Sequence, residues 1–203
     1  MKVLQRSESR PSAFSLVELL VTLALMIVLF TMLYGFGSAK HQRTQKQLCH
    51  DNLQKIYLAM QIYANDFSGR LPENTNANTS EDVLGELVPR YTADTTIFIC
   101  PGGRDKQFAS GEPLAKHKIS YAYYMGRRLD SPQDALMSDR QVDTEPKRAG
   151  EFVFSANGKP PGNNHHKFGG NFLMGDGSVQ SSGPQLTFSF AVPPGVVLLN
   201  PKP

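Results

Sequence analysis

The sequence predicts an α+β fold in which one long N-terminal helix, half of it inside a membrane, packs on a small antiparallel sheet. Three observations predict this fold. No charged residue occurs in residues 19–39, apolar residues then recur at helical spacing as far as Tyr63, and short apolar segments separated by turn residues follow. A chain of 203 residues with this pattern suits one head domain with an N-terminal appendage.

The composition excludes several classes of protein. A net charge of +3, from 21 Lys and Arg against 18 Asp and Glu, is too small to indicate a nucleic-acid-binding protein. Two cysteines exclude a disulfide-dense scaffold and a metal site built from four thiolates. The informative features of this chain are therefore local ones.

Residues 14–39 are predicted to form a transmembrane helix. At about 1.5 Å per residue, the uncharged part spans about 31 Å, which matches the hydrocarbon core of a bilayer. Residues 1–13 carry three basic residues against one acidic residue, so the positive-inside rule places the N-terminus in the cytoplasm and the head on the outer face of the membrane. An ordinary secretory signal cut near residues 37–39 is the alternative, although its apolar part is usually only about 7–15 residues long.

The helix is predicted to continue through residues 40–66, so that it covers residues 14–66 in all. Apolar residues recur there at spacings of three and four, at Cys49, Leu53, Ile56, Met60 and Tyr63. Ser68 and Gly69 are expected to end the helix near Asp66. A juxtamembrane coiled coil would show the same narrow apolar seam.

Residues 67–183 are predicted to form the globular head. A short helix is expected at residues 81–88, because Pro89 ends it. Apolar runs predict strands at residues 97–100, 119–123, 152–154 and 171–174.

Two polar or proline-rich segments complete the head. Residues 131–150 are expected to be loop, with residues 135–137 pairing at a sheet edge. The proline-rich tail, residues 184–203, is expected to supply an edge strand and an extended end.

A turn is predicted at Asp176 and Gly177, because an Asp-Gly pair supplies the positive φ angles of a hairpin. His166 precedes Asp176 by ten residues, so a membrane-tethered extracytoplasmic binding module or hydrolase built on this hairpin is one alternative function. The side chains that a metal would use are His117, His165, His166, Asp139 and Asp176. Their spacing matches no known set such as His-Glu-x-x-His, so no catalytic residue is assigned.

Glu18 is an acidic residue near the start of the apolar segment. A carboxylate within a membrane costs on the order of 2.5–3.5 kcal/mol on insertion scales, and such residues usually have a partner. The run FSLVELL at residues 14–20 resembles the processing motif of type IV pilins and type II secretion pseudopilins. The resemblance implies a pilin-like fold, in which the long helix carries a small α+β head.

The resemblance also implies roles for individual residues. A membrane-bound prepilin peptidase would cut between Ala13 and Phe14, removing the basic leader, and would methylate the new amine of Phe14. Ala13 departs from the glycine that the family normally has there. Glu18, the fifth residue of the mature chain, would pair with the N-terminal amine of a neighbouring subunit, because two opposite charges compensate each other in lipid.

The resemblance further implies a structural subunit rather than an enzyme. Its partners would be the prepilin peptidase, other pilin-like subunits that polymerise through the N-terminal helix, and the secretion or pilus assembly machinery, with no nucleic acid. The product would be a type IV pilus or a type II secretion pseudopilus.

The sequence His166-x9-Asp176-Gly177 resembles a C-terminal motif of prepilin-like proteins of planctomycete and verrucomicrobial bacteria. Further stretches match that subfamily in order, at Cys49, Asn52-Leu53, Tyr63-Ala64, residues 69–72, Cys100-Pro101 and Ser120-Tyr121. Some pseudopilins carry calcium in a loop of the head. Calcium near Asp176 is therefore an alternative to a turn without a metal.

Cys49 and Cys100 lie outside the membrane on the predicted topology, where oxidation is permitted. A disulfide between them would close a loop of about 50 residues and stabilise the head by about 2–4 kcal/mol. Two buried free thiols are the alternative, because Cys49 lies in the apolar seam.

Overall fold

The computed structural model describes residues 14–35, 37–129 and 131–203. The chain divides into two compact units, Met1–Lys40 and His41–Pro203. The second unit includes both the predicted amphipathic half of the helix and the proline-rich tail, so these two segments belong to the head.

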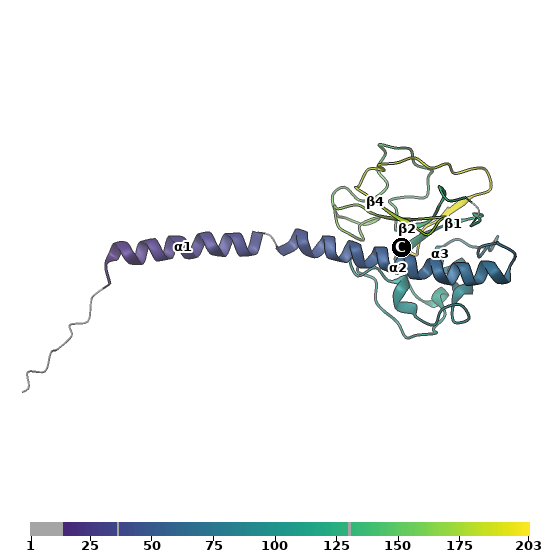
Figure 1. The fold of residues 1–203 in the computed structure, drawn as a ribbon, viewed down its shortest axis with the longest axis horizontal. Helices are drawn as coiled ribbons and strands as arrows, with labels where there is room; N and C mark the ends of the chain where they lie inside the picture. The colour runs from purple at the N-terminus through teal and green to yellow at the C-terminus, as the bar shows by residue number, and fades with distance from the viewer. Residues whose placement is uncertain (1–13, 36, 130) are drawn as a thin grey trace, which may run out of the picture. The chain divides into compact units, whose positions relative to one another are not determined.

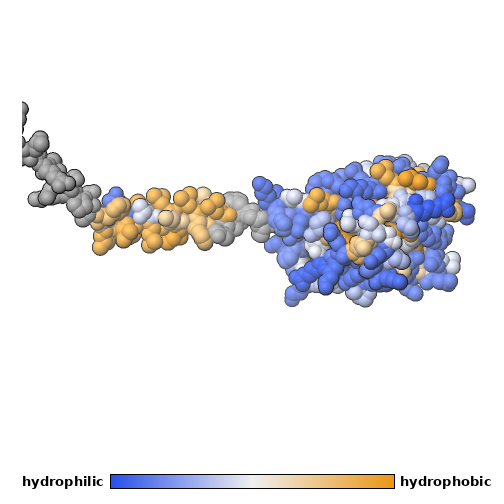
Figure 2. Space-filling view, turned by 90° about the horizontal axis from the view of Figure 1, so that it is seen from below, coloured by the Kyte–Doolittle hydropathy of each residue, from blue (hydrophilic) through white to orange (hydrophobic). Residues whose placement is uncertain are grey.

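The first unit contains helix α1, Leu16–Gly35. Residues Leu16–Leu33 are long and apolar enough to cross a membrane, and none of this stretch is buried inside the protein. Figure 2 shows the helix as a continuous apolar surface, while most of the visible head surface is hydrophilic. The prediction of an N-terminal helix that is long and apolar enough to span a membrane is confirmed.

Helix α2 runs from Gly37 to Asp66 and ends where the sequence predicted. Phe36, between the two helices, lies outside the described residues, so the continuity of one helix over residues 14–66 stays a prediction. The apolar seam of α2 is buried along its whole length, at Cys49, Leu53, Ile56, Met60 and Tyr63. Residues three or four apart share one face of a helix, and this face supplies one side of the main core.

Five antiparallel strands form one sheet in the order β4-β3-β2-β1-β5. Their bounds are Tyr121–Met125 for β1, Ala135–Asp139 for β2, Gly170–Met174 for β3, Val179–Ser182 for β4 and Val197–Leu199 for β5. The α+β class is therefore confirmed. The tail supplies the edge strand β5, as expected.

The two faces of the sheet are buried by different segments. Successive side chains of β1 alternate, so that Tyr121 and Tyr123 pack in the core against α2, whereas Ala122 and Tyr124 belong to a second core. In Figure 1, α2 passes along one side of the sheet. The sheet is thus the middle layer of the head.

The tail covers the second face. Leu186 is buried there, and Phe188 and Phe190 pack on Phe172 of β3 with ring centroids 5.2 and 5.6 Å away. Offset and edge-on aromatic contacts of this kind add about 0.5–1.5 kcal/mol each beyond the area they bury. The tail is therefore part of the fold and not an extension of it.

Short helices connect α2 to the sheet: α3 at Ser80–Leu84, and the 3₁₀ turns η1 at Gly85–Leu87, η2 at Thr95–Phe98 and η3 at Leu114–Lys116. The helix predicted at residues 81–88 corresponds to α3 and η1. The strand predicted at residues 97–100 is wrong, because the Asp94 carboxylate accepts a hydrogen bond from the Thr96 amide at 3.0 Å and begins a helical turn there.

Two further predictions are corrected. Residues 152–154 form no strand and make only an isolated bridge from Phe152 to Gln185. Residues 135–137 belong to β2, which is the central strand and not an edge. Its last two residues, Ser138 and Asp139, are polar and fully buried. A central strand was therefore not recognised in this polar segment of the sequence.

Candidate functional site

Helix α1 is the first candidate functional surface. Its apolar side chains are exposed all round, and Glu18, in its first turn, is the only charged residue of this described helix. Phe14 lies just before the helix and is exposed, whereas Ala13 lies outside the described residues. An apolar cylinder with one acidic group requires lipid or other helices around it, because exposed apolar patches of this size mark membrane or protein contacts.

The second candidate surface belongs to the head, where Cys49 of α2 and Cys100, just after η2, form a disulfide with a Cα–Cα distance of 5.2 Å. Both residues are buried. The pairing that the sequence favoured is therefore present, and free thiols are not. The bond attaches α2 to the loop that follows η2.

A buried acid and a buried histidine lie beside the disulfide. Asp139 ends β2, His165 lies in the loop before β3, and neither is exposed. The Nε2 atom of His165 lies 3.1 Å from Oδ2 of Asp139 and 3.5 Å from Sγ of Cys100. Because the carboxylate only accepts hydrogen bonds, Nε2 carries the proton in this pair.

Two asparagines complete the surroundings of Asp139. The side-chain amide of Asn164 donates to Oδ1 at 2.9 Å, and the backbone N–H of Asn171 donates to Oδ2 at 2.7 Å. Burial alone raises the pKa of Asp139, but the charge of His165 and these hydrogen bonds outweigh it, so the pKa lies below its usual value. The carboxylate is therefore ionised inside the core.

Lys46 extends this charged centre to the surface of α2. Its ammonium donates to the carbonyls of Phe168 and Ser182 at 3.2 and 2.8 Å. Burial lowers the pKa of Lys46, while the charge of Asp139 acts in the opposite direction. The Asn171 side chain donates to the Lys46 carbonyl at 3.0 Å, so α2 and β3 are joined through polar contacts as well as apolar ones.

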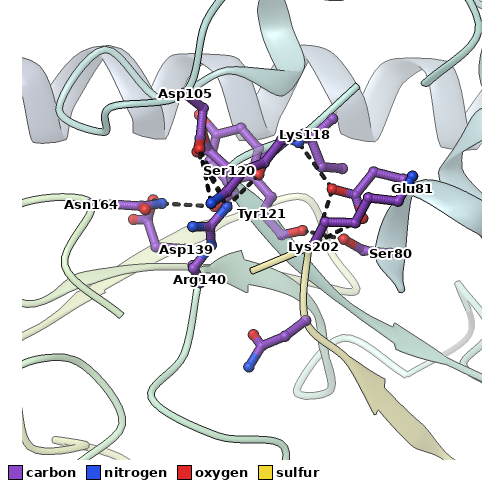
Figure 3. Close-up of polar contacts among 12 residues, drawn as sticks. Ser80, Glu81, Asp105, Lys118, Ser120, Tyr121, Asp139, Arg140, Asn164 and Lys202 are labelled. Atoms are coloured by element: carbon purple, nitrogen blue, oxygen red, sulfur yellow. Dashed lines mark hydrogen bonds and ion pairs between the residues drawn. The ribbon is translucent and has the colours of Figure 1, made fainter. Parts of the chain in front are cut away.

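A second polar network lies beside the first, and the Asn164 side chain joins the two by donating to the Ser120 carbonyl at 2.7 Å (Figure 3). Asp105 accepts a hydrogen bond from the Ser120 hydroxyl at 2.7 Å and lies 3.3 Å from Nη2 of Arg140. Nη2 of Arg140 also donates to the Ile119 carbonyl at 2.7 Å, and Lys118 lies 3.9 Å from Asp105. One carboxylate thus holds two cations at the start of β1.

Glu81 of α3, also drawn in Figure 3, holds three segments together. This fully buried carboxylate accepts the backbone N–H of Ile119 at 3.0 Å and the backbone N–H of Lys202 at 3.1 Å. The contacts attach the chain after the sheet's edge strand to α3 and to the residues before β1. Glu81 is therefore an organising residue of the fold.

A pocket of about 520 Å³ opens beside the second network. Its lining combines cations with proline rings, chiefly Arg104, Lys118, Arg140, Pro160, Pro161 and Pro201. None of the described residues that line it is serine, cysteine or histidine. The pocket therefore offers contacts to an anionic group and an apolar surface.

The structure does not bring His166 and Asp176 together. His166 lies before β3 and Asp176 lies after it, so that about 17 Å of strand separates their segments. Both side chains are exposed, and the described residues show no hydrogen bond between them. The hairpin turn itself is present, with Asp176 accepting the Ser178 amide at 2.8 Å. Hydrogen bonds from Ser178 lower the pKa of Asp176.

The turn has a packing role. Gly177 has φ +82°, and a Cβ atom there would lie 2.5 Å from the ring of Tyr57 on α2. The Tyr57 hydroxyl donates to the Gly175 carbonyl at 3.0 Å. The β3–β4 hairpin is thus docked on α2, and the glycine permits both the turn and the close approach.

Among the described residues, no group of three or more thiol, imidazole or carboxylate ligands includes Asp176. Calcium at this turn stays a prediction. The group that does converge consists of Cys49, Cys100, Asp139 and His165.

Comparison of the chain with known protein families, with curated proteins and with solved structures gave no match. A proposal of function therefore depends on the residues of the chain itself.

From the sequence, Asp139 and His165 were only two of the five residues considered as metal ligands. Their pairing was missed because they are 26 residues apart and because two histidines are adjacent. The available indication was a polar pair, Ser138-Asp139, directly after the apolar Leu136-Met137, which is the pattern of a core strand that ends in a polar site.

Proposed function

We propose that this protein is a prepilin-like structural subunit, anchored by α1 in the inner membrane and assembled into a type IV pilus or a type II secretion pseudopilus. The observation that carries the proposal is the unburied apolar helix α1 with a single acid in its first turn. A membrane anchor alone needs no acid, and the acid is costly in lipid unless it has a partner.

In this proposal the basic residues 1–13 keep the N-terminus in the cytoplasm until a prepilin peptidase cuts after Ala13. The new amine of Phe14 on one subunit then pairs with Glu18 of its neighbour. Helix α1 is both the membrane anchor and the inner layer of the filament, and the head forms the outer surface. The subunit has a structural role, and a cytoplasmic ATPase drives its addition.

The architecture of the head supports this role. The buried face of α2 packs on the sheet, and the Cys49–Cys100 disulfide attaches α2 to the loop after η2, so that a force applied along α2 is transmitted to the head. The alternative function, a binding module or hydrolase at the His166 and Asp176 hairpin, has no comparable support, because these residues lie beyond opposite ends of β3.

The proposal is tested by Glu18→Ala, with Thr22→Ala as a matched control one turn along α1. The Thr22 hydroxyl only bonds back to the Leu19 carbonyl, so its loss leaves the apolar surface intact. We expect the Glu18→Ala variant to reach the membrane in normal amounts. Its amount in sheared filaments should be at least tenfold lower than that of the unmodified protein. Normal incorporation of Glu18→Ala would contradict the proposal.

A further inference from the structure

Four residues from four segments converge at one point in the core of the head. Cys49 comes from α2, Cys100 follows η2, Asp139 ends β2 and His165 precedes β3. Their sulfur, oxygen and nitrogen atoms all lie within 4.8 Å of one another, and all four side chains are buried. Two thiolates, one imidazole and one carboxylate are ligands that zinc takes in closed tetrahedral sites.

We propose that, when the Cys49–Cys100 disulfide is reduced, the head binds one zinc ion through Cys49, Cys100, Asp139 and His165. The disulfide and the metal are then two alternative links between the same segments. The ion would keep α2 attached to the sheet in the reduced protein.

The spacing of the ligand atoms fits this ion. Zinc–ligand bonds of about 2.0–2.3 Å in a tetrahedron place neighbouring ligand atoms about 3.3–3.8 Å apart. Nε2 of His165 already lies 3.5 Å from Sγ of Cys100 and 3.1 Å from Oδ2 of Asp139. The bonded sulfurs have to separate, which reduction of the disulfide permits, and the ligand atoms, already within 4.8 Å of one another, have to adjust by side-chain movements.

The surroundings of the ligands also fit. Metal ligands in proteins are usually held by further hydrogen bonds, which orient them before the metal binds. Asn164 and the Asn171 amide hold the two oxygens of Asp139 in this way. Gly102 lies so close to His165 that a Cβ atom there would be 2.7 Å from Nδ1, so the imidazole is confined with Nε2 directed at the cluster.

Charge favours the ion as well. Two thiolates and one carboxylate carry three negative charges, which zinc reduces to one, and the Lys46 ammonium interacts with Asp139 from the α2 side. An ionised carboxylate buried without a counter-charge is costly, so buried charges are paired or bind metals. In the oxidised protein the His165 ring and the amides of Asn164 and Asn171 donate hydrogen bonds to the carboxylate, and in the reduced protein zinc supplies a positive charge beside it.

The reaction is balanced by a dithiol reductant. The dithiol gives two electrons and two protons to the disulfide, becomes a disulfide itself and leaves two thiols on Cys49 and Cys100. Zinc then binds both sulfurs as thiolates and takes the place of the proton on Nε2 of His165. The two thiol protons pass to the solvent, and the imidazole exchanges its Nε2 proton through the solvent for one on Nδ1, so it stays neutral. Reoxidation by a small disulfide, which takes the two electrons, together with two protons from the solvent, and becomes a dithiol, removes both sulfur ligands and releases the ion.

The site is tested on the full chain in detergent micelles, reduced with a phosphine and titrated with Co²⁺ as a spectroscopic substitute for zinc. We expect one Co²⁺ per reduced chain, with a thiolate charge-transfer band and tetrahedral d–d bands, and no such spectrum from the oxidised chain. Excess Zn²⁺ should abolish the spectrum. A reduced chain that takes up no Co²⁺ would overturn the proposal.

Single substitutions test whether His165 and Asp139 are ligands, with the adjacent histidine as a control. His165→Asn and Asp139→Asn should each weaken zinc affinity at least tenfold, whereas His166→Asn, at the adjacent exposed position, should leave it unchanged. Equal affinity in all three variants would mean that the cysteines act without His165 and Asp139, and the proposal would be wrong.

Variants at buried positions can fail to fold, so a measurement on the unmodified chain is also needed. X-ray absorption at the zinc edge of the reduced protein should show two sulfur ligands at about 2.3 Å and two nitrogen or oxygen ligands at about 2.0 Å. A shell of four sulfurs, which requires two chains, or a shell without sulfur would refute the site.

Discussion

Reduction of the Cys49–Cys100 disulfide should destabilise the head strongly when metals are absent. The two cysteines are 51 residues apart in the sequence. In the chain-entropy model, a loop of this size is worth about 4 kcal/mol at 25 °C. Most single domains have only about 5–15 kcal/mol of stability in total, so the loss is a large fraction of it.

The assay is urea unfolding of the full chain in micelles with a chelator present, followed by tyrosine fluorescence. The chain has no tryptophan, and six of its seven tyrosines lie in the head, so most of the emission reports the head. With an m-value of about 2 kcal/mol per M, the midpoint should fall by about 2 M on reduction. The Cys49→Ala/Cys100→Ala double variant should behave like the reduced protein.

The result that would refute this account is a midpoint that falls by less than about 0.3 M in both the reduced chain and the double variant. The loop between α2 and η2 would then be held closed in the unfolded ensemble by other contacts. Repetition without the chelator and with Zn²⁺ should restore much of the lost stability to the reduced chain and none to the double variant.

Three further changes test the packing of the head. Leu53→Ala should cost about 2–5 kcal/mol in the same unfolding assay because Leu53 is fully buried, whereas Leu58→Ala on the exposed face of α2 should change stability by less than about 0.5 kcal/mol; similar losses for both would contradict the assignment of the seam. Gly177→Ala should cost more than about 1 kcal/mol, since φ is +82° there, and unchanged stability would show that the turn relaxes easily. The pKa of Asp82 lies below its usual value: burial opposes this shift, but hydrogen bonds from the start of α3 outweigh it, so the stability that Asp82 contributes should be complete above about pH 4 and should be lost as the pH falls through the lower folded pKa. Asp82→Asn should remove this acid-dependent part of a urea midpoint series, Asp51→Asn should keep it, and the same pH profile in both would refute the assignment.

The parts of the fold that the sequence predicted are those with a regular apolar period. The seam from Cys49 to Tyr63 and the end of α2 at Asp66 agree with the structure because a helix face repeats every three to four residues. The Asp176-Gly177 turn was predictable because the turn needs positive φ angles.

The errors occur where burial and polarity do not follow that period. Residues 97–100 are apolar because they are buried, but the Asp94 cap makes them begin as a helical turn. In β2 the opposite occurs, since Ser138 and Asp139 are buried through hydrogen bonds and conceal a central strand.

No sequence pattern indicates which of the adjacent residues His165 and His166 is buried beside Asp139. His166 adopts φ +56°, and it is exposed while His165 is buried. The ring of His166 lies against Gly158, where a Cβ atom would approach it to 2.5 Å. The motif histidine therefore shapes a loop, and its neighbour pairs with Asp139.

The central claim, a processed subunit held in the membrane by α1, is tested most directly by the N-terminus of the mature chain. Mass spectrometry of the protein extracted from membranes should find a chain that begins at an N-methylated Phe14. A mature chain that begins at Lys40, without α1, would contradict the account and would indicate an ordinary secreted domain.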